Sequence, residues 1–153
     1  MIVSIDGIVD GKFLDKYGKR GVKSSGMPSL SFPINISDYD DKIVKSFAIV
    51  FSDPDSVPVC GFEWMHWLCI TTKNDLSENA SIIDKNLIQG INSWGRFCYG
   101  GMAPPDRPHT YVCKVYSLDV VPTLSNGFSL SDLEDVLVSH TIESVVVKGV
   151  YNN

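Results

Sequence analysis

Apolar and polar positions alternate along most of this chain with a period of two residues, which is typical of β-strands. The clearest apolar runs predict four strands, at residues 46–51, 65–71, 110–118 and 144–150. The second run is apolar on both faces, so we expect it to lie in the interior of a sheet. Weaker strand signals occur in the N-terminal third, at residues 2–8 and 31–36.

One segment has helical periodicity instead. Ser131 is followed three residues later by Glu134, a capping-box pattern that predicts a helix beginning at Ser131. Apolar residues at helical spacing then continue to His140, where we expect the helix to end. A second, shorter helix is predicted within residues 75–83.

Length and composition limit the possible protein classes. Strands rich in aromatic and β-branched residues, separated by Gly, Pro and Asn, predict one mainly β domain, a sandwich or barrel, over residues 1–153. The formal net charge of −5 disfavours nucleic acid as the main partner, because binding to phosphate backbones requires clustered Lys and Arg. No apolar run approaches about 18 residues, so we expect no stable membrane insertion.

The ends of the chain and its cysteines suggest a location. The N-terminal segment lacks the basic and then apolar stretch of a signal peptide. The four cysteines form no Cys-x-x-Cys pair and match no zinc-knuckle spacing. We therefore expect reduced thiols and a cytoplasmic protein.

The first segment with possible chemistry is Asp53-Pro54-Asp55-Ser56-Val57-Pro58, directly after a predicted strand. Two prolines make this corner stiff, so it is suited to aim a carboxylate inward. A plain turn explains the same residues, because Asp and Pro are common in turns.

The second segment is Glu63-Trp64-Met65-His66-Trp67, which places a histidine inside an aromatic strand. A buried imidazole needs a hydrogen-bond partner, so His66 is either a satisfied core residue or a ligand-binding one. The period of two puts His66 on the same face as Trp64 and Leu68.

The third segment is NSWGRFCYGGMAPPDRPHTY, residues 92–111, whose dense Gly and Pro predict a long loop of fixed shape. His109 stands at the entrance of the following strand, with Tyr111 on the same face. The loop is either a pocket rim, since loops on rigid scaffolds carry many sites, or a purely structural connection.

Taken in order, these motifs resemble the phosphatidylethanolamine-binding proteins, also called Raf kinase inhibitor-like proteins. The shared patterns are D-P-D-x-x-P, E-W-x-H-W, N-S-W-G-x-x-x-Y-G-G-x-x-P-P and H-x-Y. The bacterial and archaeal branch is the most similar, and the resemblance is specific over residues 45–119.

The resemblance implies a Greek-key antiparallel β-sandwich with one or two small peripheral helices. It also implies a small cavity that accepts phosphate, acetate or a phosphorylated head group. Asp53 matches the carboxylate of the cavity wall, His66 and His109 match the two pocket histidines, and Tyr111 matches the tyrosine beside them. The implied ligand-binding set is completed by the rim and wall residues Ser56, Trp64, Tyr99, Gly101, Ala103 and Pro104.

Three departures from the family pattern concern the rim. Met102 stands where bacterial relatives commonly have Pro, which predicts a less rigid lip. Ala103 stands where the eukaryotic branch commonly has Gly, which restricts how closely the backbone approaches a ligand. The corner from Asp53 to Pro58 has one residue more than the usual motif, which shifts the rim near Ser56.

Elementary electrostatics suits an anion in such a pocket. Imidazoles have an ordinary pKa of about 6.5, so a nearby carboxylate helps both to stay protonated near neutral pH. Asp53 is expected to orient one ring through a hydrogen bond, and Trp64 to supply an apolar wall. Anion binding is then predicted to weaken as the pH rises through the histidine pKa values.

Three functions follow as hypotheses. The favoured one is non-catalytic binding of a small anionic ligand without a cofactor. An inhibitor or scaffold that acts on a protein kinase or protease is the second, since some relatives act in this way. The resemblance to the bacterial branch, whose members are often dimeric, also implies a homodimer. A hydrolase using the Asp53–His pair is the third. Against it, Ser93 lacks a G-x-S-x-G setting, Cys98 lacks an activating one, and no metal-binding motif is present.

Overall fold

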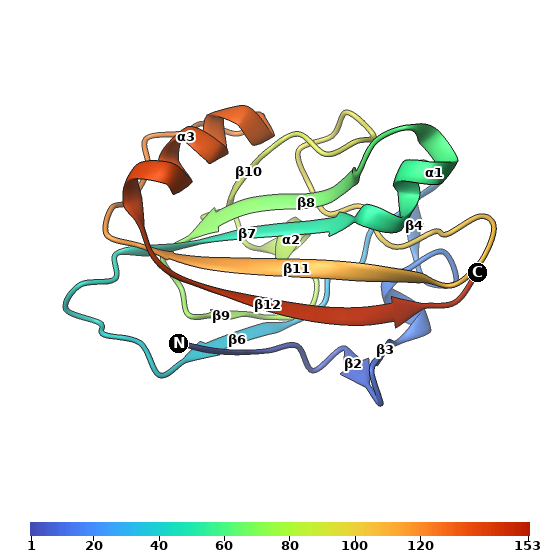
Figure 1. Cartoon of the computed structure of the whole chain (residues 1–153), viewed down its shortest axis with the longest axis horizontal. Helices are drawn as coiled ribbons and strands as arrows, with labels where there is room; N and C mark the ends of the chain where they lie inside the picture. The colour runs from blue at the N-terminus through green and yellow to red at the C-terminus, as the bar shows by residue number, and fades with distance from the viewer.

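Four long strands form the centre of the fold and run side by side in Figure 1. The computed structural model describes residues 1–153. Each long strand contains one of the four strongest predicted runs, which are therefore confirmed. They are β7 (Ser46–Asp53), β8 (Trp64–Thr71), β11 (His109–Leu118) and β12 (Thr141–Tyr151).

The long strands belong to a seven-stranded sheet of order β10-β8-β7-β11-β12-β3-β2. The remaining members are short: β10 (Ile88–Gln89), β3 (Lys12–Phe13) and β2 (Ile8–Val9). Within the sheet, β11 returns beside β7 rather than β10, and the resulting order β11-β7-β8-β10 is that of a Greek key. The sheet is mixed rather than purely antiparallel, because β12 pairs in parallel with β3 through Val150 and Lys12.

A second, three-stranded sheet covers one face of the large sheet. It contains β1 (Ile2–Ser4), β6 (Ile34–Ser37) and β9 (Asp75–Leu76), and a separate hairpin joins β4 (Lys23–Ser24) to β5 (Met27–Pro28). The main core lies between the two sheets. Phe32 is fully buried at its centre, and its ring packs edge-on against those of Phe51, Trp67 and Tyr99.

The opposite face of the large sheet packs against α3 (Leu130–His140), through Leu133. The helix ends where the sequence predicted, but it begins earlier. Ser129 is the N-cap, and its hydroxyl accepts from the Asp132 N–H while Asp132 accepts from the Ser129 N–H. The prediction that Ser131 caps the helix is wrong, because the chain holds two overlapping capping patterns and the earlier one forms.

The other helices are single turns. They are η1 (Asp15–Tyr17), η2 (Pro54–Ser56), α1 (Val57–Cys60) and α2 (Ala80–Ile83), so the fold has three α-helices rather than one or two. The predicted short helix within residues 75–83 is confirmed as α2, which occupies the last four of them, while Asp75–Leu76 form β9. None of the helices has the length and apolar character needed to cross a membrane.

Candidate ligand-binding pocket

A pocket of about 300 Å³ opens at the end of the large sheet where β7 ends and β8 and β11 begin. In Figure 1 this is the end occupied by α1, and α3 lies toward the other end. Alternation along each strand brings Asp53, His109 and Tyr111 to the face of the main core. The lining residues are Asp53, Ser56, Val59, Cys60, Trp64, His66, Trp94, Ala103, Pro105, His109 and Tyr111.

His109 lies between two carboxylates. Its Nδ1 is 2.7 Å from Asp53 Oδ2, and its Nε2 is 2.8 Å from Asp106 Oδ1. The Asp53 and His109 side chains are almost fully buried, whereas about half of the Asp106 side chain is exposed. Carboxylates only accept hydrogen bonds, so both ring nitrogens donate and the ring is an imidazolium.

The pKa of His109 reflects two opposed effects. Burial alone would lower it, because a charged ring loses hydration. The hydrogen bonds and negative charges of Asp53 and Asp106 outweigh burial and raise the pKa above its ordinary value. His109 therefore carries the positive charge that the sequence predicted for this pocket.

His66 has a different environment. Its Nδ1 is 2.7 Å from the carbonyl oxygen of Gly100, to which it donates, and its ring packs against those of Phe51, Tyr111 and Trp94. No carboxylate offsets its burial, which lowers the pKa of His66 to about 4. The expectation that both imidazoles are protonated near neutral pH is wrong for this one. Its Nε2 is then an unprotonated acceptor.

A β-bulge sets the direction of His66. Phe51 pairs with Trp67 and the next residue, Ser52, pairs with Met65, so His66 and Trp67 together face one residue of β7. His66 therefore shares the pocket face with Trp64, as predicted, but not with Leu68, which packs on the opposite face of the sheet. The strict period of two fails at this single extra residue.

The Asp-Pro-rich corner is a short helical turn rather than a plain loop. Ser56 is buried there, and its hydroxyl donates to the Asp53 carbonyl at 2.6 Å and accepts from the Trp64 N–H at 2.9 Å. Asp55 Oδ2 accepts from the Thr110 N–H at 2.8 Å, and this bond lowers the pKa of the Asp55 carboxyl. These bonds join the ends of β7, β8 and β11 around the pocket.

Three buried polar atoms that belong to pocket-lining residues have no hydrogen-bond partner of good geometry: Asp53 Oδ1, Trp64 Nε1 and Tyr111 Oη. Asp53 and Tyr111 interact with each other, and burial together with this neighbouring carboxylate raises the pKa of Tyr111. Every other buried side-chain nitrogen or oxygen atom of the protein has a hydrogen-bond partner. Buried polar groups are nearly always paired in native proteins, and an unpaired one costs about 1–3 kcal/mol. All three belong to residues that line the same cavity.

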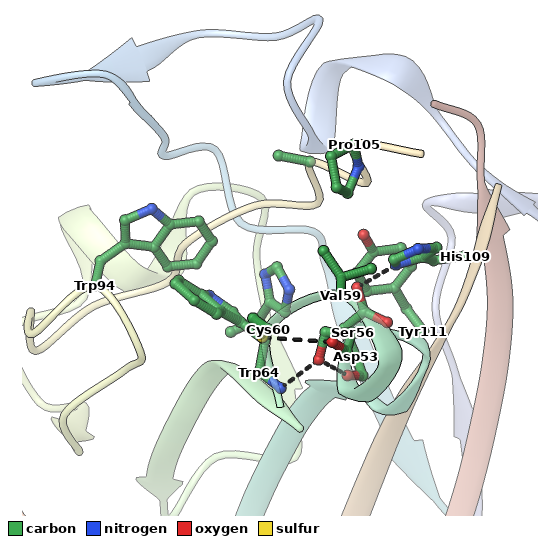
Figure 2. Close-up of a pocket in the computed structure, with 11 residues that line it drawn as sticks. Asp53, Ser56, Val59, Cys60, Trp64, Trp94, Pro105, His109 and Tyr111 are labelled. Atoms are coloured by element: carbon green, nitrogen blue, oxygen red, sulfur yellow. Dashed lines mark hydrogen bonds and ion pairs between the residues drawn. The ribbon is translucent and has the colours of Figure 1, made fainter. Parts of the chain in front are cut away.

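Sequence reasoning missed part of the lining. Figure 2 shows Trp94 on the side of the pocket opposite His109, with Pro105 at the mouth. The Trp64 and Trp94 rings meet edge-on, with centroids 5.1 Å apart, and form an aromatic wall. Trp94 and Pro105 lie inside motifs that were quoted from the sequence, whereas no pattern pointed to Val59 and Cys60 of α1.

Three residues predicted for the ligand-binding set do not line the pocket: Tyr99, Gly101 and Pro104. Their contacts fix the position of the rim loop instead. The buried Tyr99 hydroxyl donates to the Tyr17 carbonyl, and Lys19 Nζ donates to the Pro104 carbonyl. Gly101 packs so closely on the Tyr17 backbone that a Cβ would clash with it.

The lip is anchored beside these residues. Met102 is fully buried, forms a β-bridge with Gly18, and accepts from the Lys19 N–H at 2.7 Å. Ala103, the next residue, is exposed and lines the pocket.

The arrangement has few features of a reactive centre. No three His, Cys, Asp or Glu side chains are grouped so that they could hold a metal ion. The Ser56 hydroxyl bonds only to backbone groups, so no histidine activates it. Both nitrogens of His109 donate, which leaves this ring no lone pair to accept a proton.

Known proteins resemble this chain over nearly its whole length. The family model described as "Phosphatidylethanolamine-binding protein" matches residues 4–152. The uncharacterized protein YxkA of Bacillus subtilis is 34% identical over 148 residues, which cover 87% of this chain and 88% of that protein. A UPF0098 protein of Chlamydia muridarum is 32% identical over 142 residues, with 89% and 87% covered.

Solved structures show the same fold. The crystal structure of a putative phosphatidylethanolamine-binding protein homologue from Chlamydia trachomatis superposes with a TM-score of 0.83 at 27% identity, covering 99% of this chain and 96% of that one. YbcL of E. coli, described as a new member of the mammalian PEBP family, gives a TM-score of 0.81 at 24% identity, covering 99% and 97%. The similarity to YbcL concerns the fold alone.

Proposed function

Because the chain belongs to the phosphatidylethanolamine-binding protein family, we propose that its pocket binds a small oxyanion, phosphate or a phosphorylated head group, without catalysing a reaction. The observation that carries this proposal is that all three buried polar atoms without a well-formed hydrogen bond belong to residues that line one cavity. A bound molecule that pairs with them removes the cost of leaving them buried.

The chemistry of these atoms matches an oxyanion. Trp64 Nε1 is a donor only, and Tyr111 Oη is able to donate, so both suit the oxygens of a phosphate. Asp53 Oδ1 and the neutral His66 ring are acceptors, and they suit a ligand oxygen that carries a proton. A phosphate or phosphomonoester monoanion offers both kinds of oxygen.

The charge of the pocket favours a ligand with a low negative charge. The His109 imidazolium is the one cationic group that lines it, and Asp53 largely balances that charge. The aromatic wall of Trp64 and Trp94 suits an apolar or weakly polar part of the same ligand.

The other hypotheses lack such an observation. An Asp–His hydrolase needs an imidazole that a carboxylate orients and that accepts a proton. His109 contacts carboxylates but donates through both nitrogens, and the neutral His66 bonds to a backbone carbonyl instead of a carboxylate. The kinase or protease partner, the homodimer and the cytoplasmic location stay predictions from the sequence.

Titration with inorganic phosphate, followed by NMR of the histidine rings, tests the proposal. The chain has three histidines, and His140 lies outside the pocket, so it serves as an internal control. Phosphate is expected to shift the His109 and His66 signals but not that of His140. His109→Ala is expected to lose most of the binding. Unchanged His109 and His66 signals at saturating phosphate would contradict the proposal.

A further inference from the structure

Asp106 holds the ring nitrogen of His109 that Asp53 leaves free, although Asp106 itself is not one of the residues that line the pocket. The Nε2–H of His109 is the charged donor that remains after Asp53 has taken Nδ1, and Asp106 Oδ1 accepts from it at 2.8 Å. Asp106 comes from the rim loop rather than from the sheet, three residues before His109. A carboxylate is itself a small oxyanion, so the protein carries a copy of the ligand chemistry on its own loop.

We infer that Asp106 is an internal ligand of the pocket residue His109: its carboxylate holds the His109 Nε2–H in the free protein, and an external oxyanion binds by displacing it. This inference rests on the proposed function, and it adds the group against which every ligand must compete. Asp106 is suited to leave, because about half of its side chain is exposed. Asp53 is buried and remains in place.

The charges around Asp106 favour an exchange of this kind. Facing it are His109 and Arg107, whose Nε is 3.9 Å from Asp106 Oδ2. Arg107 also lies 3.4 Å from Asp55, so it is shared between two carboxylates and holds neither tightly. Asp53 lies on the far side of the His109 ring and repels a second negative charge there. An anion that replaces Asp106 therefore keeps the local charge balance, whereas one that binds beside it adds uncompensated charge.

Displacement also selects a class of ligand. Asp106 is tethered close to His109, so its effective concentration is of millimolar order or higher. A ligand that offered only one oxygen to His109 would exchange one carboxylate contact for another and gain nothing. The gain comes from the unpaired Tyr111 Oη and Trp64 Nε1, which Asp106 leaves without partners. Tetrahedral oxyanions with three or more oxygens are therefore favoured over carboxylates with two.

The experiment compares Asp106→Ala with Asp119→Ala, a closely matched control. Asp119 is also half-exposed and also lies 2.8 Å from a histidine, His140, but outside the pocket. Affinities for inorganic phosphate and for acetate are measured at about pH 6, where an imidazole with a raised pKa is protonated. Asp106→Ala is expected to bind phosphate about tenfold more tightly than the unchanged protein, as for release of one charge-assisted hydrogen bond. Asp119→Ala is expected to leave the affinity unchanged.

Further measurements keep the outcomes separate. Asp106→Asn retains an acceptor without the charge and is expected to give an intermediate affinity. The unchanged protein is expected to prefer phosphate over acetate. If the unchanged protein and Asp106→Ala bind phosphate equally, or the variant binds more weakly, the competition is refuted while the proposed function stands. If neither the unchanged protein nor any of the variants binds phosphate, the proposed function fails, and the inference fails with it.

Discussion

The two pocket histidines lie at the same end of one sheet, His66 near the start of β8 and His109 at the start of β11, and they carry different charges. His66 and His109 are equally inaccessible, with 3% and 1% of their surfaces exposed. His66 donates to a backbone carbonyl among aromatic rings and is neutral, while His109 donates to two carboxylates and is charged. Burial alone therefore does not determine the charge of an imidazole here. The hydrogen-bond partners that surround each ring determine it.

Of the changes considered, removal of the Asp53 charge should alter the stability of the protein most, because Asp53 sets the charge difference between the two histidines. Asp53→Asn leaves the buried His109 with the half-exposed Asp106 as its remaining counter-charge, and we expect a loss of up to about 3–5 kcal/mol in the free energy of unfolding near neutral pH. Urea unfolding measures it. Asp119→Asn, which breaks the exposed pair with His140, is the control and should cost little. Similar losses in the two variants would show that the buried pair is not special.

The neutral state of His66 should make the protein sensitive to acid. Its pKa is about 4 in the folded protein and about 6.5 in the unfolded chain, so the unfolded chain binds the extra proton between these values. Stability is then complete above about pH 6.5 and falls by about 3 kcal/mol as the pH drops to about 4. Unfolding curves across this range measure the loss.

His66→Gln is expected to remove most of this acid-dependent loss, whereas His140→Gln is expected to retain it. The lowered pKa values of Asp55 and Asp106 add a separate loss, but at lower pH, as these carboxyls become protonated. Equal pH dependence in His66→Gln and the unchanged protein would mean that His66 is already charged when folded.

His109 should set the opposite pH dependence for ligand binding. Acetate affinity is expected to fall by up to about tenfold per pH unit once the pH exceeds the raised pKa of His109. Acetate is the better probe, because phosphate changes its own charge in this range. His66→Gln should keep this profile and Asp53→Asn should move it to lower pH. A profile unaffected by Asp53→Asn would separate binding from the His109 charge. The contribution of His109 to folding stability has the same sign as its effect on binding. Because the pKa of His109 is raised in the folded protein, this contribution is present at low pH and is lost as the pH rises through the folded-state pKa.

The smallest effect is expected at Tyr111, whose hydroxyl has no partner in the free protein. Tyr111→Phe should change the free energy of unfolding by less than about 1 kcal/mol and should weaken phosphate binding about fivefold. Tyr99→Phe is the matched control, because its buried hydroxyl donates to the Tyr17 carbonyl and its loss should cost about 1 kcal/mol. Calorimetric binding and urea unfolding distinguish the two tyrosines. Destabilisation by Tyr111→Phe equal to that by Tyr99→Phe would mean that Tyr111 is already paired.

Regular alternation made much of the fold and pocket predictable. The four long strands follow from their apolar runs, and the shared face of His109 and Tyr111 follows from a period of two. The same rule failed for His66 and Leu68, because one extra residue in β8 changes the phase of the strand. No local pattern in the sequence marks that residue.

Other features depended on competition that the sequence does not resolve. Ser129 and Ser131 both begin acceptable capping patterns, and the tertiary fold selects the first. The charge of His66 depended on whether Asp53 reached it, and Asp53 reached His109 instead. The spacing of Asp106 and His109 in a Pro-rich loop was a signal that could have suggested their contact, since a short, stiff connection limits how far they separate.

The anchored lip has a consequence for how such pockets diversify. Residues 103–108 run between two anchored points, Met102 on its bridge to Gly18 and His109 in β11. This six-residue segment contains Asp106 and the pocket-lining residues Ala103 and Pro105, yet it contributes no strand to the sheets. Exchanging it for another sequence of equal length should retune ligand choice while the scaffold stays intact, as hypervariable loops do on other rigid frameworks.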